Sequence, residues 1–143
     1  LDALSRGSII YGNASAATTV LTKGGAATVL TSDGTDISWS AATGGTSWQA
    51  VVTGATQTAV AGNGYFINTT SNVCTLTLPA GTLGDEVSVV DYAGTFDTNT
   101  LTITANGSEK IHSSTDDLTA TIERAAFTLV FTDSTQGWLL KDK

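Results

Sequence analysis

Charged and chemically reactive side chains are scarce in this sequence. Only 13% of the 143 residues are charged, roughly half of the share that is usual in globular domains, and there is one proline, one cysteine, one histidine and no methionine. The lone cysteine, Cys74, can form neither an internal disulfide nor a cysteine-based zinc site. The lone histidine, His112, lacks a nucleophile and an orienting carboxylate at a recognisable spacing, which a catalytic triad requires. We therefore expect no enzymatic activity and no catalytic, metal-binding or cofactor-binding residue.

The charge and hydropathy of the chain argue against two classes of partner. A formal net charge of −7 and a pI near 4.2 would repel a phosphate backbone, so we expect no nucleic acid as a ligand. No apolar run approaches the roughly 20 residues that a membrane-spanning helix needs, so we expect no membrane insertion. Because the chain begins at Leu1 and lacks methionine, we also expect a fragment or processed product.

Uncharged polar residues take the place of the missing charges. Apolar residues make up 41% of the chain, and serine, threonine, asparagine and glycine fill most of the remainder. Threonine fits a pleated strand, while glycine and asparagine favour turns. The composition therefore predicts an all-β fold with many short strands.

The sequence divides into two parts with different patterns. In the first part, short apolar clusters are separated by Gly, Ala and Ser and are too scattered to enclose a core within one chain. The small residues of 41–47 then form a stretch typical of a hinge. We place a domain boundary there, with an extended arm that is intertwined in a shaft over residues 1–47 and a C-terminal β-domain over residues 48–143.

Alternation of apolar and polar residues beyond this boundary predicts strands with one buried face. The expected strands cover residues 48–53, 58–61, 65–68, 73–78, 86–91, 100–105, 118–123, 126–132 and 138–141. Short strands at a spacing of about 8 to 12 residues indicate an antiparallel β-sandwich of jelly-roll type. The side chains expected inside it are Cys74, Leu76, Leu78, Val87, Val89, Leu101, Ile103, Leu118, Ile122, Phe127, Leu129 and Phe131.

Two stretches of the sequence carry a family resemblance. The first comprises LSRGSIIYG (residues 4–12), VLTKG (20–24) and VLTSDGTDISW (29–39), and it resembles a recurrent segment of phage tail-fibre and other virion proteins. The second comprises LPAG (78–81), GDEVSVVD (84–91), NTLTITAN (99–106) and GWL (137–139), and it is similar to β-rich modules of such proteins. The resemblance implies a trimeric structural component of the virion, as in marine or cyanobacterial phages, that serves in virion assembly or host attachment.

The apolar clusters of the arm independently favour a homotrimer. Identical arms that wrap one another would bring copies of each cluster together at a shared axis, and glycine and alanine spacers would permit close approach. The residues expected at this oligomer interface are Ile9, Ile10, Tyr11, Val29, Leu30, Ile37 and Trp39. The favoured interpretation is a segment of a tail fibre or fibre-like appendage in the virion, with other virion proteins as further partners.

Two alternatives belong to other functional classes. A capsid decoration (cement) protein would tie neighbouring capsomers together through the arm. A receptor module would bind a host surface glycan, for which Trp39, Trp48 or Trp138 would supply a stacking surface if exposed. Packing in a core or at a subunit interface is the favoured interpretation of each tryptophan, because an indole buries a large apolar area.

The remaining polar clusters have simple structural interpretations. The pairs Asp85–Glu86 and Asp116–Asp117 would suit a calcium ion in charge, but they lack the alternating ligand spacing of a dedicated loop. We interpret them as turn residues, and we interpret the Asp-Gly-Thr-Asp stretch of residues 33–36 in the same way. Cys74 lies on the apolar side of its strand without a neighbouring cation, so we expect it to be buried and inert.

Overall fold

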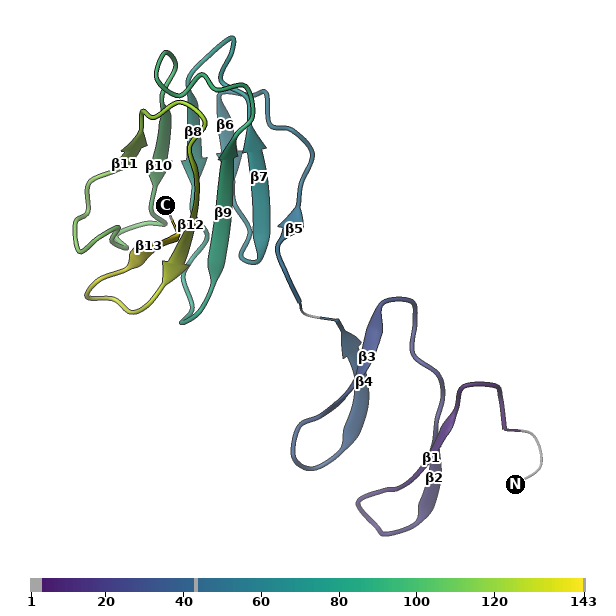
Figure 1. Cartoon of the computed structure of the whole chain (residues 1–143). Coiled ribbons are helices and arrows are strands. Elements are labelled where there is room, and N and C mark those ends of the chain that lie inside the picture. The colour runs from purple at the N-terminus through teal and green to yellow at the C-terminus, as the bar shows by residue number, and fades with distance from the viewer. Residues whose placement is uncertain (1–3, 43, 143) are drawn as a thin grey trace. The chain divides into compact units, whose positions relative to one another are not determined.

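The computed structural model describes residues 4–42 and 44–142, and over those residues it contains strands and turns but no helix (Figure 1). The predicted all-β fold is confirmed. Within the described residues, no helix is present that would be long and apolar enough to cross a membrane. The chain divides into two compact units, Leu1–Gly44 and Gly45–Lys143, close to the boundary predicted after residue 47.

The first unit, called the arm below, consists of two β-hairpins. Its strands are β1 (Ile9–Gly12), β2 (Thr18–Leu21), β3 (Thr28–Ser32) and β4 (Ile37–Ala41). β1 pairs antiparallel with β2, and β3 pairs antiparallel with β4. Asn13 and Asp33 stabilise the two turns, because their side-chain oxygens accept hydrogen bonds from backbone N–H groups two to four residues further along. The turn predicted over residues 33–36 is therefore present.

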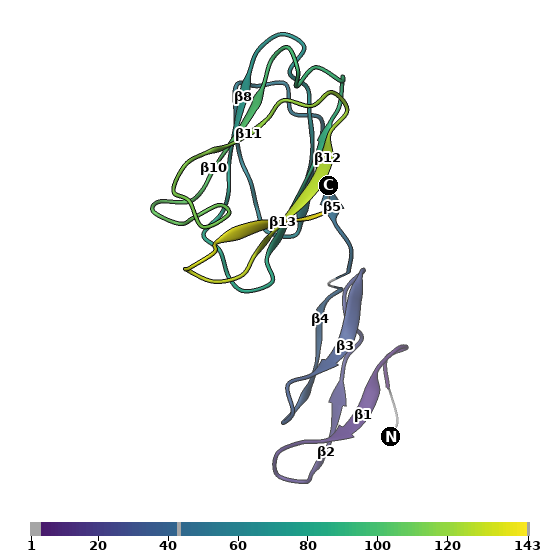
Figure 2. The same cartoon turned by 60° about the vertical axis from the view of Figure 1, so that its left-hand side comes forward.

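The second unit is built from two sheets (Figures 1 and 2). Its strands are β5 (Ser47–Trp48), β6 (Thr56–Thr58), β7 (Asn63–Ile67), β8 (Cys74–Thr77), β9 (Glu86–Asp91), β10 (Leu101–Thr104), β11 (Leu118–Ala120), β12 (Ala126–Phe131) and β13 (Trp138–Asp142). The four-stranded sheet has the order β11-β10-β8-β6, and the five-stranded sheet has the order β13-β12-β9-β7-β5. From β5 to β10 the chain therefore moves to the opposite sheet with every new strand.

The antiparallel pairing predicted for this domain is wrong for most of its strand pairs. The pairs β5–β7, β7–β9, β6–β8 and β8–β10 are parallel, whereas β9–β12, β12–β13 and β10–β11 are antiparallel. A parallel pair needs a long crossover between its strands, and here the intervening strand in the opposite sheet provides it. Inward and outward side chains alternate in both kinds of pair, so the alternation in the sequence could not distinguish them.

Side chains from both sheets form the buried core. Its members are Ala59, Tyr65, Ile67, Cys74, Leu76, Leu78, Val87, Val89, Phe96, Leu101, Ile103, Ile111, Leu129, Phe131 and Trp138. The parallel register places Cys74 beside Leu101 and Leu76 beside Ile103, so the inward set repeats from one strand to its neighbour. Nine of the twelve side chains predicted to lie inside are thus buried.

The other three predicted core residues lie nearer the surface. Leu118 and Phe127 are partly buried and pack against the core. Ile122 is 72% exposed, so its assignment to the core was wrong. The reason is that β11 ends at Ala120, before the predicted end of that strand, and the chain then turns so that the amide of Ala125 donates to the carbonyl oxygen of Ile122. The alternation of the strand does not continue through a turn.

Candidate functional site

The outer face of the five-stranded sheet carries a groove that we call the β9 groove. It consists of two adjoining hollows of about 410 and 310 Å³, and both are lined by Thr46 and Ser88. Ser88 lies between Val87 and Val89 on β9, whose side chains are buried in the core, so its own side chain faces outward. The shared lining residues make the two hollows parts of one surface feature.

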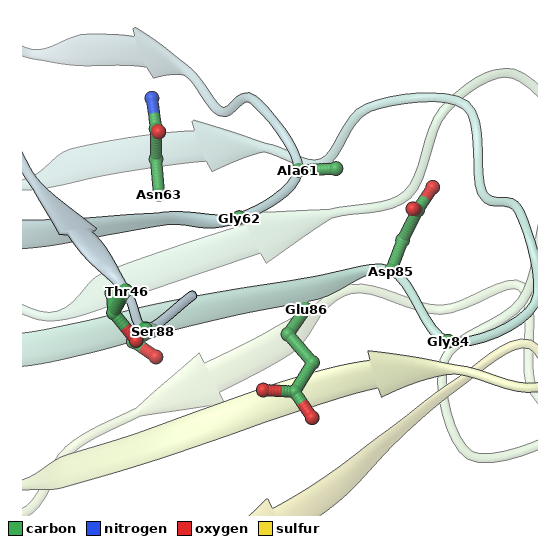
Figure 3. A pocket seen from close by; sticks show the side chains of 9 residues that line it. Thr46, Ala61, Gly62, Asn63, Gly84, Asp85, Glu86 and Ser88 are labelled. Carbon is green, nitrogen blue, oxygen red and sulfur yellow. The ribbon is translucent and has the colours of Figure 1, made fainter. Parts of the chain in front are cut away.

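The larger hollow is lined by two acidic residues, Asp85 and Glu86, together with Thr46, Asn63 and Ser88 (Figure 3). Asp85 accepts a hydrogen bond from the amide of Thr82 at 2.8 Å, as expected of a turn residue. Glu86 forms an ion pair with Lys141 at 2.8 Å, and the hydrogen bond and charge of Glu86 raise the pKa of Lys141. Among residues 4–42 and 44–142, no group of three or more His, Cys, Asp or Glu side chains could hold a metal ion. This hollow therefore offers hydroxyl, amide and backbone groups beside the carboxylate of Asp85 and the ion-paired carboxylate of Glu86.

The smaller hollow is bordered by a tryptophan that is fixed in place. Trp48 pairs in register with Gly64 of the neighbouring strand, and a Cβ atom at Gly64 would lie 2.5 Å from Cε3 of the indole. The ring of Phe66 stacks on Trp48, with centroids 4.6 Å apart and an angle of 24° between the planes. Gly64 and Phe66 are two residues apart on β7 and so lie on the same side of the sheet. They cover one side of the indole, and Trp48 remains 47% exposed.

Hydroxyl and carboxylate groups lie across the same hollow from the indole. The hydroxyl groups of Ser88 on β9 and Thr128 on β12 are 3.0 Å apart and share a hydrogen bond. The register between β12 and β13 shifts at this point, so that Leu129 pairs with Leu140 but Thr128 pairs with Asp142. This β-bulge places Asp142 beside Thr128 at the edge of the hollow, which it also lines.

The three tryptophans that were considered as stacking surfaces have three different environments. Trp138 is fully buried, and its indole N–H donates to Glu109 at 3.3 Å. Trp39 is half-buried in the arm, where its indole N–H donates to the carbonyl oxygen of Thr22 at 2.7 Å. Trp48 alone among them is exposed, and it borders the groove. Core packing is therefore confirmed for Trp138 only.

The residues predicted at an oligomer interface all lie on strands of the arm. Ile9, Ile10, Tyr11, Val29, Leu30, Ile37 and Trp39 belong to β1, β3 and β4. None of them is buried, and Ile10, Val29 and Leu30 are 39% to 44% exposed. The interface itself stays a prediction.

The other residues singled out in the sequence lie apart from the groove. Cys74 is buried in the core, as predicted, and burial raises the pKa of its thiol. His112 is exposed in a turn, and its backbone amide donates to the carbonyl oxygen of Trp138. Asp116 accepts a hydrogen bond from the hydroxyl of Ser114, which is consistent with a turn residue.

The sequence did not reveal the polar residues of the groove. Ser88, Thr128 and Asp142 are far apart along the chain, and each resembles many other outward-facing residues of a threonine-rich sequence. They meet only because β9, β12 and β13 are neighbours in the sheet and because a bulge shifts the last pairing. The one signal of the site that a sequence could carry is an aromatic residue opposite a glycine on the neighbouring strand, here Trp48 opposite Gly64. That signal can be read only when the strand register is known.

Comparison with known proteins assigns no family to the chain. No family model matches it, and no curated protein is significantly similar to it in sequence. The arm and the β9 groove are therefore interpreted from their own chemistry.

Proposed function

We propose that this chain is a structural component of a bacteriophage virion, a segment of a tail fibre or fibre-like appendage that acts as a homotrimer in virion assembly or host attachment. The observation that supports this proposal most directly is the exposed apolar surface of the arm. No described residue from Leu4 to Ala42 is buried, although β1 to β4 carry isoleucine, valine, leucine and tryptophan side chains. A protein that stayed monomeric would leave this surface in water.

The arm is also too small to be stable as separate hairpins. An isolated two-stranded hairpin is marginally stable at best in water, and the arm has two of them. Association with two identical arms would cover Ile10, Val29 and Leu30 and would add the stabilisation that the hairpins lack. Closed symmetry would also limit open-ended aggregation through these side chains.

The second unit would then serve as the compact body of the appendage. Its two sheets enclose one core, and we propose that this β-sandwich forms a knob or an attachment collar. Its large buried core gives it an independent stability that the arm lacks. A rigid body joined to an associating arm is a suitable design for a repeated virion component.

The test is the oligomeric state of the whole chain and of residues 45–143, measured by native mass spectrometry and light scattering. We expect a trimer for residues 1–143, a folded monomer for residues 45–143, and a melting temperature of the whole chain that rises with protein concentration. Leu30→Asn should weaken the trimer, whereas Val73→Asn, a change at a 54% exposed valine of the second unit, should not. A full-length monomer with an ordered arm would contradict the proposal.

A capsid decoration protein is the alternative that the same exposed arm supports, since a capsid lattice could cover it instead. The two assignments differ in the position of the chain in the virion. Cryo-electron microscopy of an intact particle would locate the density of the second unit either on an appendage or at regular positions on the shell. Regular positions on the shell would replace the fibre assignment.

A further inference from the structure

We propose that the β9 groove binds a neutral oligosaccharide, with Trp48 as the stacking surface and with Ser88, Thr128 and Asp142 as hydrogen-bonding groups. This inference goes beyond the structural role proposed above and does not depend on the trimer. It depends only on the second unit, which contains the whole groove.

The first argument is the fixed, half-exposed indole. A sugar ring presents an apolar C–H face that packs well on a flat aromatic surface, and an indole joins a large apolar face to a polar N–H. Phe66 and Gly64 hold Trp48 against the sheet, so little side-chain freedom is lost when a ligand stacks on it. By contrast, Tyr92 is 52% exposed but lines neither hollow of the groove.

The second argument is the arrangement of polar groups next to the indole. Specific small-ligand sites combine aromatic lining with a few converging polar groups in hollows of about 300 to 1,000 Å³. The hydroxyls of Thr128 and of Ser88, which is 7% exposed, share a hydrogen bond that uses one of their two O–H donors, so one donor and further lone pairs are left for a ligand. The carboxylate of Asp142 accepts hydrogen bonds, which suits the hydroxyl groups of a sugar. Together these groups can both donate to and accept from such a ligand.

The third argument concerns the charge and length of the ligand. Asp85 and Asp142 line the groove, and the charge of Glu86 is balanced by Lys141. With a net charge of −7 on the chain, an acidic polysaccharide or a phosphate would be repelled. Because the second hollow continues from the first through Thr46 and Ser88, the groove favours a chain of several sugar units over a single one.

The test is isothermal titration calorimetry of the full chain with defined hexasaccharides. The neutral probes are the hexamers of β-1,4-linked glucose, β-1,4-linked N-acetylglucosamine and α-1,4-linked glucose, and the acidic probe is the hexamer of galacturonic acid. We expect at least one neutral hexamer to bind and to protect Trp48 from quenching by acrylamide, and we expect no binding of the acidic hexamer.

Variants then assign the binding to the groove. Trp48→Ala should weaken the affinity about tenfold or more, which corresponds to about 1.4 kcal/mol, whereas Trp48→Phe should retain most of it because a flat ring remains. Asp142→Asn should weaken it about threefold without a change in the melting temperature, and it serves as the test if Trp48→Ala does not fold. Tyr92→Ala is the matched control, since it removes an exposed aromatic ring outside the groove and should leave the affinity unchanged.

Three results would overturn the proposal. The first is that no neutral hexamer binds at up to about 10 mM, which corresponds to a binding free energy weaker than about −3 kcal/mol. The second is a preference for the acidic hexamer. The third is an affinity of the Trp48→Ala or Asp142→Asn variant that equals that of the unchanged chain. None of these results would bear on the trimer, which is tested by the oligomeric state alone.

Discussion

The ring of Phe131 meets the indole of Trp138 edge to face, with centroids 5.5 Å apart and an angle of 66° between the planes. The two residues are direct partners across β12 and β13. Gly81 also lies against the ring of Phe131, and a Cβ atom at that position would overlap the ring. Strand pairing, an aromatic contact and a glycine thus fix the same side chain, and Phe131 is only 8% exposed.

Replacing this ring should therefore destabilise the second unit strongly. Phe131→Ala is expected to lower the free energy of unfolding by about 3 to 5 kcal/mol, because it leaves a cavity between Gly81 and Trp138. Urea denaturation of residues 45–143 would measure the change. Tyr92→Ala, at a 52% exposed aromatic residue, should cost less than about 1 kcal/mol. A similarly small loss for Phe131→Ala would mean that the ring contributes little to the core.

Asp91 holds two loops together at the end of β9. This carboxylate is 2% exposed and accepts hydrogen bonds from the backbone amides of Gly94, Thr95, Phe96 and Arg124 at 2.9 to 3.2 Å. Arg124 adopts a positive φ of 59°, an unfavourable conformation that its hydrogen bond to Asp91 helps to maintain.

Removing this carboxylate should leave four backbone amides, one of them buried, without this acceptor. Asp91→Asn is expected to cost about 1 to 3 kcal/mol of unfolding free energy, because its NH₂ group faces amides that are themselves donors, and Asp91→Ala should cost more. Asp97→Asn is the matched control, since among the described residues this exposed carboxylate accepts only from the hydroxyl of Thr98, and it should change stability by less than about 0.5 kcal/mol. Thermal and urea unfolding would rank the three variants, and equal effects would contradict the role assigned to Asp91.

Acid should weaken the turn that joins β12 and β13. Hydrogen bonds from the amides of Gln136 and Thr135 lower the pKa of Asp133 below its usual range. Because the pKa of Asp133 is lowered in the folded state, its ionised carboxylate stabilises the folded chain above the usual carboxyl pKa of about 3.9. This stabilisation is lost as the pH falls through the folded-state pKa. Asp133→Asn should thus reduce the loss of stability below that pH.

Unfolding curves between pH 2 and pH 6 would measure this dependence on acid. Ser134→Ala changes an exposed residue of the same turn that does not titrate, so it should leave the dependence unaltered. If Asp133→Asn and the unchanged protein lost stability in parallel below pH 4, another group would be responsible.

The thiol of Cys74 should report on unfolding of the second unit. The side chain is 1% exposed, and desolvation raises the pKa of the thiol, so both access and ionisation oppose its reaction. We expect a disulfide reagent at pH 8 to react only as fast as the second unit opens, whereas the chain in urea should react rapidly. Phe131→Ala should accelerate the reaction, because it destabilises the same core. Rapid labelling of the folded, unchanged chain would refute the buried, inert assignment.

Much of the strand content could be predicted from the sequence, but the pairing could not. Alternation on each strand depends on local geometry, and it located Leu76, Val89 and Ile103 in the core. Whether neighbouring strands run parallel depends on which sheet the chain enters next, and alternation is the same in both cases. Ile122 was misplaced because the sequence did not show that β11 ends at Ala120.

The candidate site was less predictable for a related reason. From the sequence, Trp48 could either pack in a core or interface or serve as an exposed stacking surface. Only its pairing with Gly64 showed that one side of the indole is covered and the other exposed. Ser88 and Asp142 carry no local pattern that separates them from other polar residues. Their significance comes from sheet order and from a β-bulge, which are properties of the folded chain.

The last prediction concerns Gly24, which makes room for the residue that links the two hairpins of the arm. A Cβ atom at Gly24 would lie 2.7 Å from Cδ2 of Trp39 and would overlap the side chain of Thr28, whereas a Cβ atom at Gly25 would meet nothing within 4 Å. Gly24→Ala should therefore displace the indole and break its hydrogen bond to the carbonyl oxygen of Thr22, while Gly25→Ala should be tolerated.

Hydrogen exchange measured by mass spectrometry would distinguish these two variants. In Gly24→Ala the amides of β1 to β4 should exchange about tenfold faster or more, which is the change expected for about 1.4 kcal/mol of lost local stability. The amides of the second unit should keep their protection, because that unit has its own core. If the trimer depends on an ordered arm, Gly24→Ala should also lower the concentration dependence of melting, and Gly25→Ala should not. Equal exchange in the two variants would show that Trp39 does not hold the hairpins together.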